Sequence, residues 1–127
     1  MGEIYSFVTL TNFANPAKKM KFQALVDTGA SYLTLPNAWK DELGKMELVE
    51  SVELRTATQE KIPGEVCGPV RIQIEGFRPI ASEVLFIEME SDDGNYEPLL
   101  GHLALQQAGI AIDMLSHRLM KGRYLVK

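Results

Sequence analysis

The feature that most constrains the fold is a set of short runs rich in β-branched and aromatic residues, in which apolar and polar side chains partly alternate. This alternation has the period of two that is typical of β-strands. Turn-forming residues separate the runs. We predict seven to nine short strands in an all-β protein with a closed or folded-over sheet. The runs cover residues 4–10, 20–26, 32–35, 49–58, 66–74, 80–89, 110–114 and 118–125.

The segments between the strands predict turns and two short helices. Residues 12–19 read as a polar turn between the first two strands. The polar stretch from Thr58 to Glu65 contains Pro-Gly and is expected to be an exposed hairpin end. One helix is predicted over residues 38–43, capped by Asn37, and another over residues 102–108.

The chain has 127 residues, which is enough for one compact domain, residues 1–127, with a single core. It is too short to form two such domains. A hydrophobic fraction of 46% with 24% charged residues is typical of a globular protein. Thirteen Lys and Arg against seventeen Asp and Glu give a net charge of −4. This excludes the basic surface that nucleic-acid-binding proteins use to neutralise phosphates.

The cysteine content and the N-terminus indicate the compartment. The single cysteine, Cys67, cannot form an internal disulfide, so we expect a small buried side chain and no dependence on an oxidising compartment. The N-terminus lacks the basic region and apolar run of a secretory signal. No apolar run approaches the roughly 20 residues that span a membrane. We therefore expect a cytoplasmic protein without a membrane partner.

The segment Ala24-Leu-Val-Asp-Thr-Gly-Ala-Ser31 is the most informative about function. An apolar strand leads directly into Asp27, and a carboxylate at the end of a buried strand needs hydrogen bonds. Thr28, Gly29 and the small residues after them permit a tight turn whose backbone N–H groups reach that carboxylate. The Asp-Thr-Gly triplet alone is not specific, because it occurs by chance in about 2–3% of chains of this length. One interpretation is therefore a plain turn that ends a hairpin strand.

A second element, Pro98-Leu-Leu-Gly101 followed by a short helix, lies about seventy residues downstream. With Leu33-Thr-Leu-Pro36, the hairpin of residues 57–70 and Gly109-Ile-Ala-Ile-Asp113, it makes the sequence resemble the retropepsin-like aspartic proteases, in particular their single-domain bacterial members. The resemblance covers most of the chain. It implies a closed β-barrel half with one or two short helices, one catalytic Asp per chain, and an active site on the two-fold axis of a symmetric dimer.

The resemblance also implies a role for each motif. Asp27 would be the catalytic residue. Its supporting loop would consist of Thr28, whose hydroxyl would bond across the dimer axis, and of Gly29, Ala30 and Ser31. The psi loop, which packs beneath the catalytic loop, would be Leu99, Leu100 and Gly101. A flap that closes over a bound peptide would be formed by Thr58, Gln59, Glu60, Lys61, Ile62 and Pro63.

The chemistry of aspartic proteolysis predicts the oligomeric state. Two facing carboxylates are needed, one to take a proton from water and one to protonate the scissile carbonyl. Because the chain has one Asp-Thr-Gly, Asp27 must meet its symmetry mate in a homodimer. The close pair of carboxylates would share one proton. The expected partner is an extended peptide, bound as an added strand in a groove lined by Leu25, Leu33 and Ile62. No cofactor is required.

Other interpretations remain open at this point. The same fold without useful turnover would be a peptide-binding or dimerisation module, and an unrelated β-barrel ligand binder would be a monomer. Retroviral flaps are Gly-rich at the tip, whereas this one is polar, and retroviral chains carry Arg where His102 stands. Neither His102 nor His117 has a partner at metal-ligand spacing, so no metal site is expected. Asp113 lacks the Thr-Gly context and is predicted to be a turn or salt-bridge residue.

Overall fold

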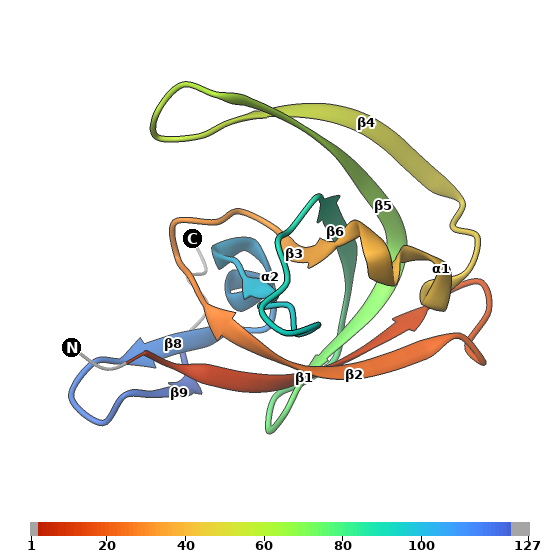
Figure 1. Ribbon diagram of the computed structural model, residues 1–127. Helices are drawn as coiled ribbons and strands as arrows, with labels where there is room; N and C mark the ends of the chain where they lie inside the picture. The colour runs from red at the N-terminus through yellow and green to blue at the C-terminus, as the bar shows by residue number, and fades with distance from the viewer. Residues whose placement is uncertain (1–2, 123–127) are drawn as a thin grey trace, which may run out of the picture.

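The structure is a computed structural model that describes residues 3–122 (Figure 1). This part of the chain consists mostly of strands, so the predicted all-β class is confirmed. No helix in it is long and apolar enough to cross a membrane. The strands are β1 (Tyr5–Asn12), β2 (Lys19–Val26), β3 (Leu33–Pro36), β4 (Leu48–Arg55), β5 (Lys61–Ile74), β6 (Ile80–Ile87), β7 (Leu99–Leu100), β8 (Ile110–Asp113) and β9 (Arg118–Lys121). The helical elements are a 3-10 turn (Asn37–Trp39), α1 (Lys40–Leu43) and α2 (His102–Gln107).

Seven strands form one sheet in the order β1-β2-β7-β3-β6-β5-β4, and a further pairing of β1 with β5 closes it into a barrel. Strand β5 is long enough to have two neighbours in succession. Its residues 61–68 pair with β4 and its residues 70–74 pair with β1. Strand β4 therefore lies outside the closed ring. Strands β8 and β9 form a separate two-stranded sheet. The expected closed barrel is confirmed.

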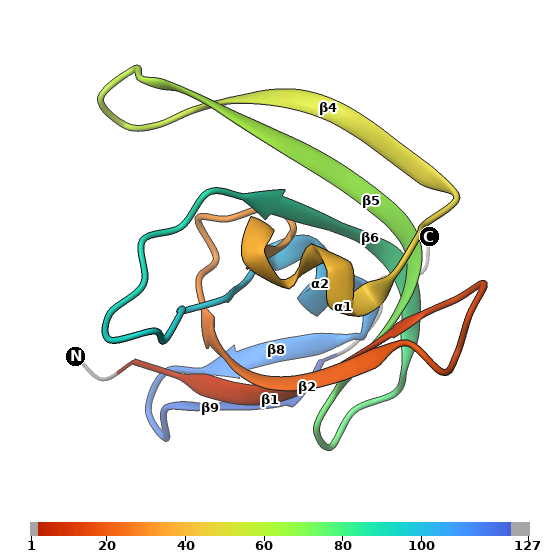
Figure 2. The same cartoon turned by 45° about the vertical axis from the view of Figure 1, so that its right-hand side comes forward.

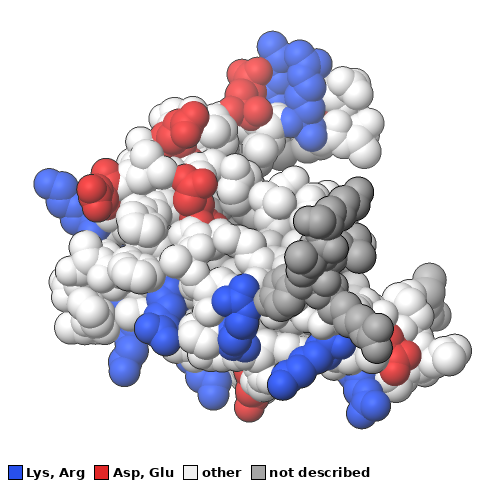
Figure 3. Space-filling view, turned by 180° about the vertical axis from the view of Figure 1, so that it is seen from behind, with Lys and Arg blue, Asp and Glu red and all other residues white. Residues whose placement is uncertain are grey.

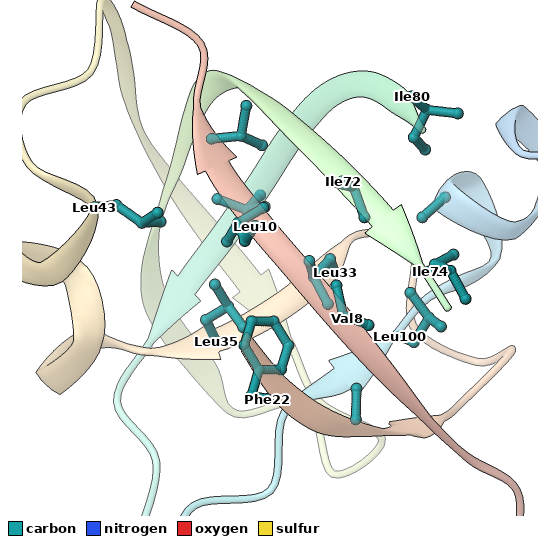
Figure 4. Packing of buried hydrophobic residues seen from close by; sticks show 14 of the residues in the cluster. Val8, Leu10, Phe22, Leu33, Leu35, Leu43, Ile72, Ile74, Ile80 and Leu100 are labelled. Carbon is teal, nitrogen blue, oxygen red and sulfur yellow. The ribbon is translucent and has the colours of Figure 1, made fainter. Parts of the chain in front are cut away.

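The core fills the barrel (Figure 4). On β5, Val70, Ile72 and Ile74 are buried while Arg71 between them is exposed, as the period of two requires. Strand β3 is buried at all four residues because β7 and β6 flank it on either side. The side chains with the least exposure include Val8, Leu10, Leu33, Leu35, Leu43, Ile72, Ile74, Val84, Phe86 and Leu100.

One local prediction is wrong, and the bounds of another need correction. The 3-10 turn has Pro36 at its N-cap, and no side chain caps it, so Asn37 is not the cap. The polar stretch 58–65 does lie at the exposed outer end of the β4–β5 hairpin, but the turn is confined to residues 56–60, so residues 61–65 already belong to β5. Pro63 is tolerated there because β6 pairs with β5 only from Gly64 onward, which leaves Pro63 with β4 as its one neighbour.

The remaining boundaries lie close to those expected. The first helix is shorter than predicted, because the 3-10 turn takes its first part and α1 is only a single turn. The second helix ends at Gln107, and Gly109 has the positive φ of 68° that favours glycine after a helix. The last strand is observed as Arg118–Lys121, and residues 123–125 of its predicted range lie outside the described residues.

Asn12 is predicted to begin a polar turn, but the structure buries its side chain, which is 1% exposed. Its Nδ2 donates hydrogen bonds to the carbonyl oxygens of Leu43 (2.8 Å) and Lys45 (2.9 Å). Its Oδ1 accepts a hydrogen bond from the backbone N–H of Ala14 (3.0 Å). The Asn12 side chain therefore joins the end of β1 to the end of α1 and satisfies polar groups that water cannot reach.

We expect Asn12→Asp to lower the free energy of unfolding by about 3 kcal/mol, because the new carboxylate removes both donors and faces two carbonyl oxygens. Urea unfolding followed by circular dichroism measures the change. The matched control is Asn15→Asp in the neighbouring exposed turn, which should stay within about 0.5 kcal/mol of the wild type. Equal effects of the two substitutions would contradict the structural role given to Asn12.

Candidate active site

Asp27 lies directly after β2, where the chain leaves the barrel. Its backbone N–H donates to the carbonyl of Leu100 (3.0 Å), and its own carbonyl accepts from the N–H of Ala30 (3.1 Å). The carboxylate Oδ1 accepts a hydrogen bond from the backbone N–H of Gly29 (3.0 Å). This is the tight turn that the sequence predicts, with a backbone N–H reaching the carboxylate. We call residues 27–31 the Asp27 loop; its Asp27 side chain is half-buried and faces open space.

Strand β7 lies beneath the Asp27 loop and holds its two ends. It pairs with the end of β2 through Val26 and Leu100 and with β3 through Thr34 and Leu99. Gly101 follows with no room for a side chain, since an added Cβ would lie 2.5 Å from the carbonyl oxygens of both Ser31 and Tyr32. Leu99, Leu100 and Gly101 therefore lie directly against the two ends of the Asp27 loop.

His102 makes contacts that the sequence does not reveal. Its backbone N–H donates to the carbonyl of Ala30 (2.9 Å), and its ring Nδ1 lies 3.0 Å from the same oxygen. Because a carbonyl oxygen only accepts, this contact requires the hydrogen on Nδ1. The next residue, Leu103, donates its N–H to the carbonyl of Ser31 (3.0 Å). The start of α2 therefore holds the second half of the Asp27 loop, and the only sequence signal was the position directly after Leu-Leu-Gly.

The other residues of the Asp27 loop are accessible. Thr28, Gly29 and Ser31 are exposed, and Ala30 is half-buried. Within residues 3–122 of this single chain, the hydroxyls of Thr28 and Ser31 make no hydrogen bond. An added Cβ at Gly29 would lie 3.2 Å from Oδ1 of Asp27, so a side chain there would crowd the carboxylate.

The β4–β5 hairpin arches over the side of the barrel on which the Asp27 loop lies (Figures 1 and 2). Its outer part has no third strand, because β6 pairs with β5 only from Gly64. Thr56 organises the turn: its N–H donates to the carbonyl of Glu60 (3.0 Å), and its hydroxyl accepts from the N–H of Glu60 (3.2 Å). Of the six predicted tip residues, Ile62 is half-buried and the others are exposed: Thr58, Gln59, Glu60, Lys61 and Pro63.

A hollow of about 390 Å³ opens beside Asp27. Its lining is mostly apolar and joins segments that are far apart in the sequence: Glu3, Ile4, Leu25, Val26, Asp27, Thr28, Ile112 and Met114. Leu25 is half-buried and lines this hollow. The expectation that Leu33 lines a groove is wrong, because Leu33 is 1% exposed and belongs to the core inside the central strand β3.

Two side chains outside this region have simple roles. Cys67 is fully buried on β5, as expected, and burial raises the pKa of its thiol although Lys40 opposes the shift. Asp113 ends β8, and hydrogen bonds from the Ser116 hydroxyl and backbone hold its pKa below its usual range. Asp113 is therefore a turn residue, as predicted. Among residues 3–122, no three His, Cys, Asp or Glu side chains are grouped so that they could hold a metal ion.

Charged side chains of both signs occur on the face opposite to that of Figure 1. In Figure 3 most Lys and Arg side chains lie in separate groups along the lower part, with Asp and Glu side chains among them, and further Lys and Arg groups lie beside Asp and Glu near the top and the left. The net charge is −4. This face therefore does not carry a continuous basic surface of the kind that binds a nucleic-acid backbone.

Comparisons with known proteins agree with this geometry. A family model for aspartyl proteases matches residues 15–102, a range that contains both the Asp27 loop and β7. Comparison with curated proteins gave no significant match. The solved structure of the EIAV protease complexed with the inhibitor HBY-793 is similar, with a TM-score of 0.64 and 18% identity over 89% of this chain and 94% of that one.

A retropepsin-like aspartic protease from Rickettsia conorii is also similar, with a TM-score of 0.51 and 21% identity over 88% of this chain and 85% of that one. Structural similarity at this level of identity concerns the fold, while the family match concerns the sequence itself and covers more than half of it. The chain therefore belongs to the aspartyl protease family and has the retropepsin fold.

Proposed function

We propose that this chain is an aspartic endopeptidase that acts as a homodimer and hydrolyses peptide bonds in an extended substrate. The observation that carries the proposal is the Asp27 loop: a carboxylate fixed by the N–H of Gly29, supported by β7 and His102, and open to the outside. A side chain held in one orientation at an accessible site is what acid–base catalysis requires. Membership in the aspartyl protease family supports the same chemistry.

The proposed reaction uses Asp27 of both copies. One carboxylate takes a proton from a water molecule, whose oxygen attacks the scissile carbonyl carbon, while the protonated partner donates its proton to the carbonyl oxygen. The tetrahedral intermediate then collapses with cleavage of the C–N bond, and the nitrogen leaves with a proton from the pair. The products are a carboxyl group and an amine, and the pair returns to sharing one proton.

The β4–β5 hairpin is proposed to act as the flap. Its tip, Thr58 to Pro63, projects beyond the barrel and has few tertiary contacts to hold it, as a mobile cover needs. A peptide between the hairpin and the Asp27 loop would be bound by its backbone as an added strand. Leu25 and Ile62 are half-buried apolar side chains suited to contact the substrate next to the cleaved bond. The Thr28 hydroxyl is proposed to bond across the two-fold axis.

The proposal is tested by incubating the wild type and Asp27→Asn with a diverse peptide mixture from acidic to neutral pH and identifying products by mass spectrometry. We expect Asp27→Asn to reduce cleavage at least about a hundredfold, because asparagine neither takes nor donates the proton. The matched control is Asp93→Asn in an exposed loop, which should cleave as the wild type does. Cleavage by Asp27→Asn, or a dimeric wild type that binds peptides without cutting them, would overturn the proposal.

A further inference from the structure

The outer face of β1 and its two neighbouring strands carries a group of three cations. Residues directly opposite each other in antiparallel strands point to the same face of a sheet. Thr11 of β1 is opposite Lys19 on β2 and Arg71 on β5. Thr9, in the next row, is opposite Lys21 on β2. The three cations are exposed, so these two rows belong to the outer face of the barrel.

None of these cations has a carboxylate partner within residues 3–122, where the two ion pairs are formed by lysines of α1 and of the start of β5. Lys21 instead lies over the ring of Phe7, 5.3 Å from its centroid. The hydroxyl of Thr11, between Lys19 and Arg71, makes no hydrogen bond in the same part of the chain. Neither row contains an acidic residue. In a chain with a net charge of −4, this is a local positive region that attracts anions.

Two hollows lie directly beside the row of Thr11. One, of about 200 Å³, is lined by Thr11, Asn12, Phe13, Pro16 and Arg71. The other, of about 220 Å³, is lined by Phe13, Arg71, Pro79, Ile80 and Ala81. Both hollows therefore combine the guanidinium of Arg71 with the ring of Phe13, which is 51% exposed. Each is smaller than the roughly 300–1,000 Å³ of a small-molecule site, which favours the single side chains of a peptide.

This region is remote from the candidate active site. Lys19 begins β2 and Asp27 follows its end, which separates the two by roughly 25 Å along the strand. Figures 1 and 2 show β1 and β2 along the lower side of the barrel, whereas the tip of the β4–β5 hairpin lies at the top. A ligand on the outer face of β1 would therefore leave the hollow beside Asp27 open.

We propose that this outer face binds an acidic segment of a partner protein that carries apolar side chains next to its carboxylates. The carboxylates would contact Arg71, Lys19 and the Thr11 hydroxyl, and the apolar side chains would enter the hollows beside Phe13. Lys19 and Lys21 are two residues apart on one strand, a spacing of about 7 Å that matches alternate side chains of an extended segment. Three cations beside two apolar hollows suit such a segment better than a nucleic-acid backbone, which needs a longer basic stripe.

The test is fluorescence anisotropy of a labelled peptide in which glutamate alternates with leucine, added to chains that all carry Asp27→Asn so that the probe is not cut. We expect saturable binding at micromolar concentrations that weakens as salt is raised. Arg71→Glu should raise the dissociation constant at least about tenfold. The matched control is Arg118→Glu, which changes the net charge equally on β9, beside the first half of β1 (Figures 1 and 2), and should have less than about a twofold effect.

A second variant, Phe13→Ser, removes the apolar contact without changing the charge and should raise the dissociation constant at least about fivefold. Circular dichroism verifies that each variant is folded. The proposal is overturned by the absence of saturable binding, by equal effects of Arg71→Glu and Arg118→Glu, or by equal binding of a peptide with lysine in place of glutamate. Tighter binding of a uridine oligonucleotide at the same residues also overturns it. None of these outcomes bears on the protease proposal, which is measured by cleavage at Asp27.

Discussion

A tenfold excess of Asp27→Asn chains is expected to lower the peptide cleavage of a fixed amount of wild-type chain about elevenfold, once the two have exchanged subunits. The active site is proposed to need one carboxylate from each copy, so a mixed pair holds only one. A wild-type chain that pairs at random then finds a second wild-type chain in about one of eleven cases. The measurement is the initial rate of cleavage of one peptide substrate, taken immediately after mixing and again after equilibration.

The time course is the control for this experiment. Immediately after mixing, before dimers exchange chains, the rate should equal that of the wild type alone. Exchange itself is followed independently by mass spectrometry of mixed pairs made from isotope-labelled Asp27→Asn. If mixed pairs form and the rate per wild-type chain does not fall, a single Asp27 is sufficient for cleavage, and the shared active site is wrong.

Gly101→Ala is expected to lower the free energy of unfolding by at least about 3 kcal/mol and to abolish cleavage. The added Cβ would lie 2.5 Å from two backbone carbonyl oxygens, those of Ser31 and Tyr32, and neither can rotate away as a side chain can. The chain must therefore separate β7 from the Asp27 loop to make room. Urea unfolding measures the free energy of unfolding. The rate of peptide cleavage per folded molecule measures whether the active site still works.

Gly94→Ala is the informative comparison for this prediction. Gly94 has a φ of 81°, which favours glycine, but an added Cβ would meet nothing within 4 Å. Its cost should be about 1 kcal/mol, with cleavage retained. The φ of Gly101 is −82°, a value any residue adopts, so backbone conformation alone predicts the opposite ranking of the two variants. A smaller loss for Gly101→Ala than for Gly94→Ala would show that β7 does not support the Asp27 loop as described.

Local patterns predicted much of this protein. The alternation of apolar and polar residues identified the all-β class and most of the strands, because the alternation reflects which face of a strand is buried. The turn around Asp27 was also predictable, since Gly29 lies two residues from the carboxylate whose Oδ1 its N–H reaches. Where both partners of a contact lie within a few residues, composition and spacing carry the information.

Contacts between distant segments were not predictable in the same way. The burial of Asn12 depends on the carbonyl of Leu43, which lies 31 residues further along the chain. Polar composition placed the end of a hairpin at residues 58–65, but pairing with β4 extends β5 through that stretch. Leu33 was expected in the groove, whereas its flanking strands bury it in the core.

The sequence alone determined that this is an all-β chain with one Asp-Thr-Gly turn after an apolar strand, because those features depend on near neighbours. The tertiary structure decided what supports that turn and what it faces. His102 contacts Ala30 across 72 residues, Gly101 fits against Ser31, and Ile112 of β8 reaches the hollow beside Asp27. The closure of the barrel brings these residues together, and a closed sheet is a property of all its strands at once, so no local pattern contains it.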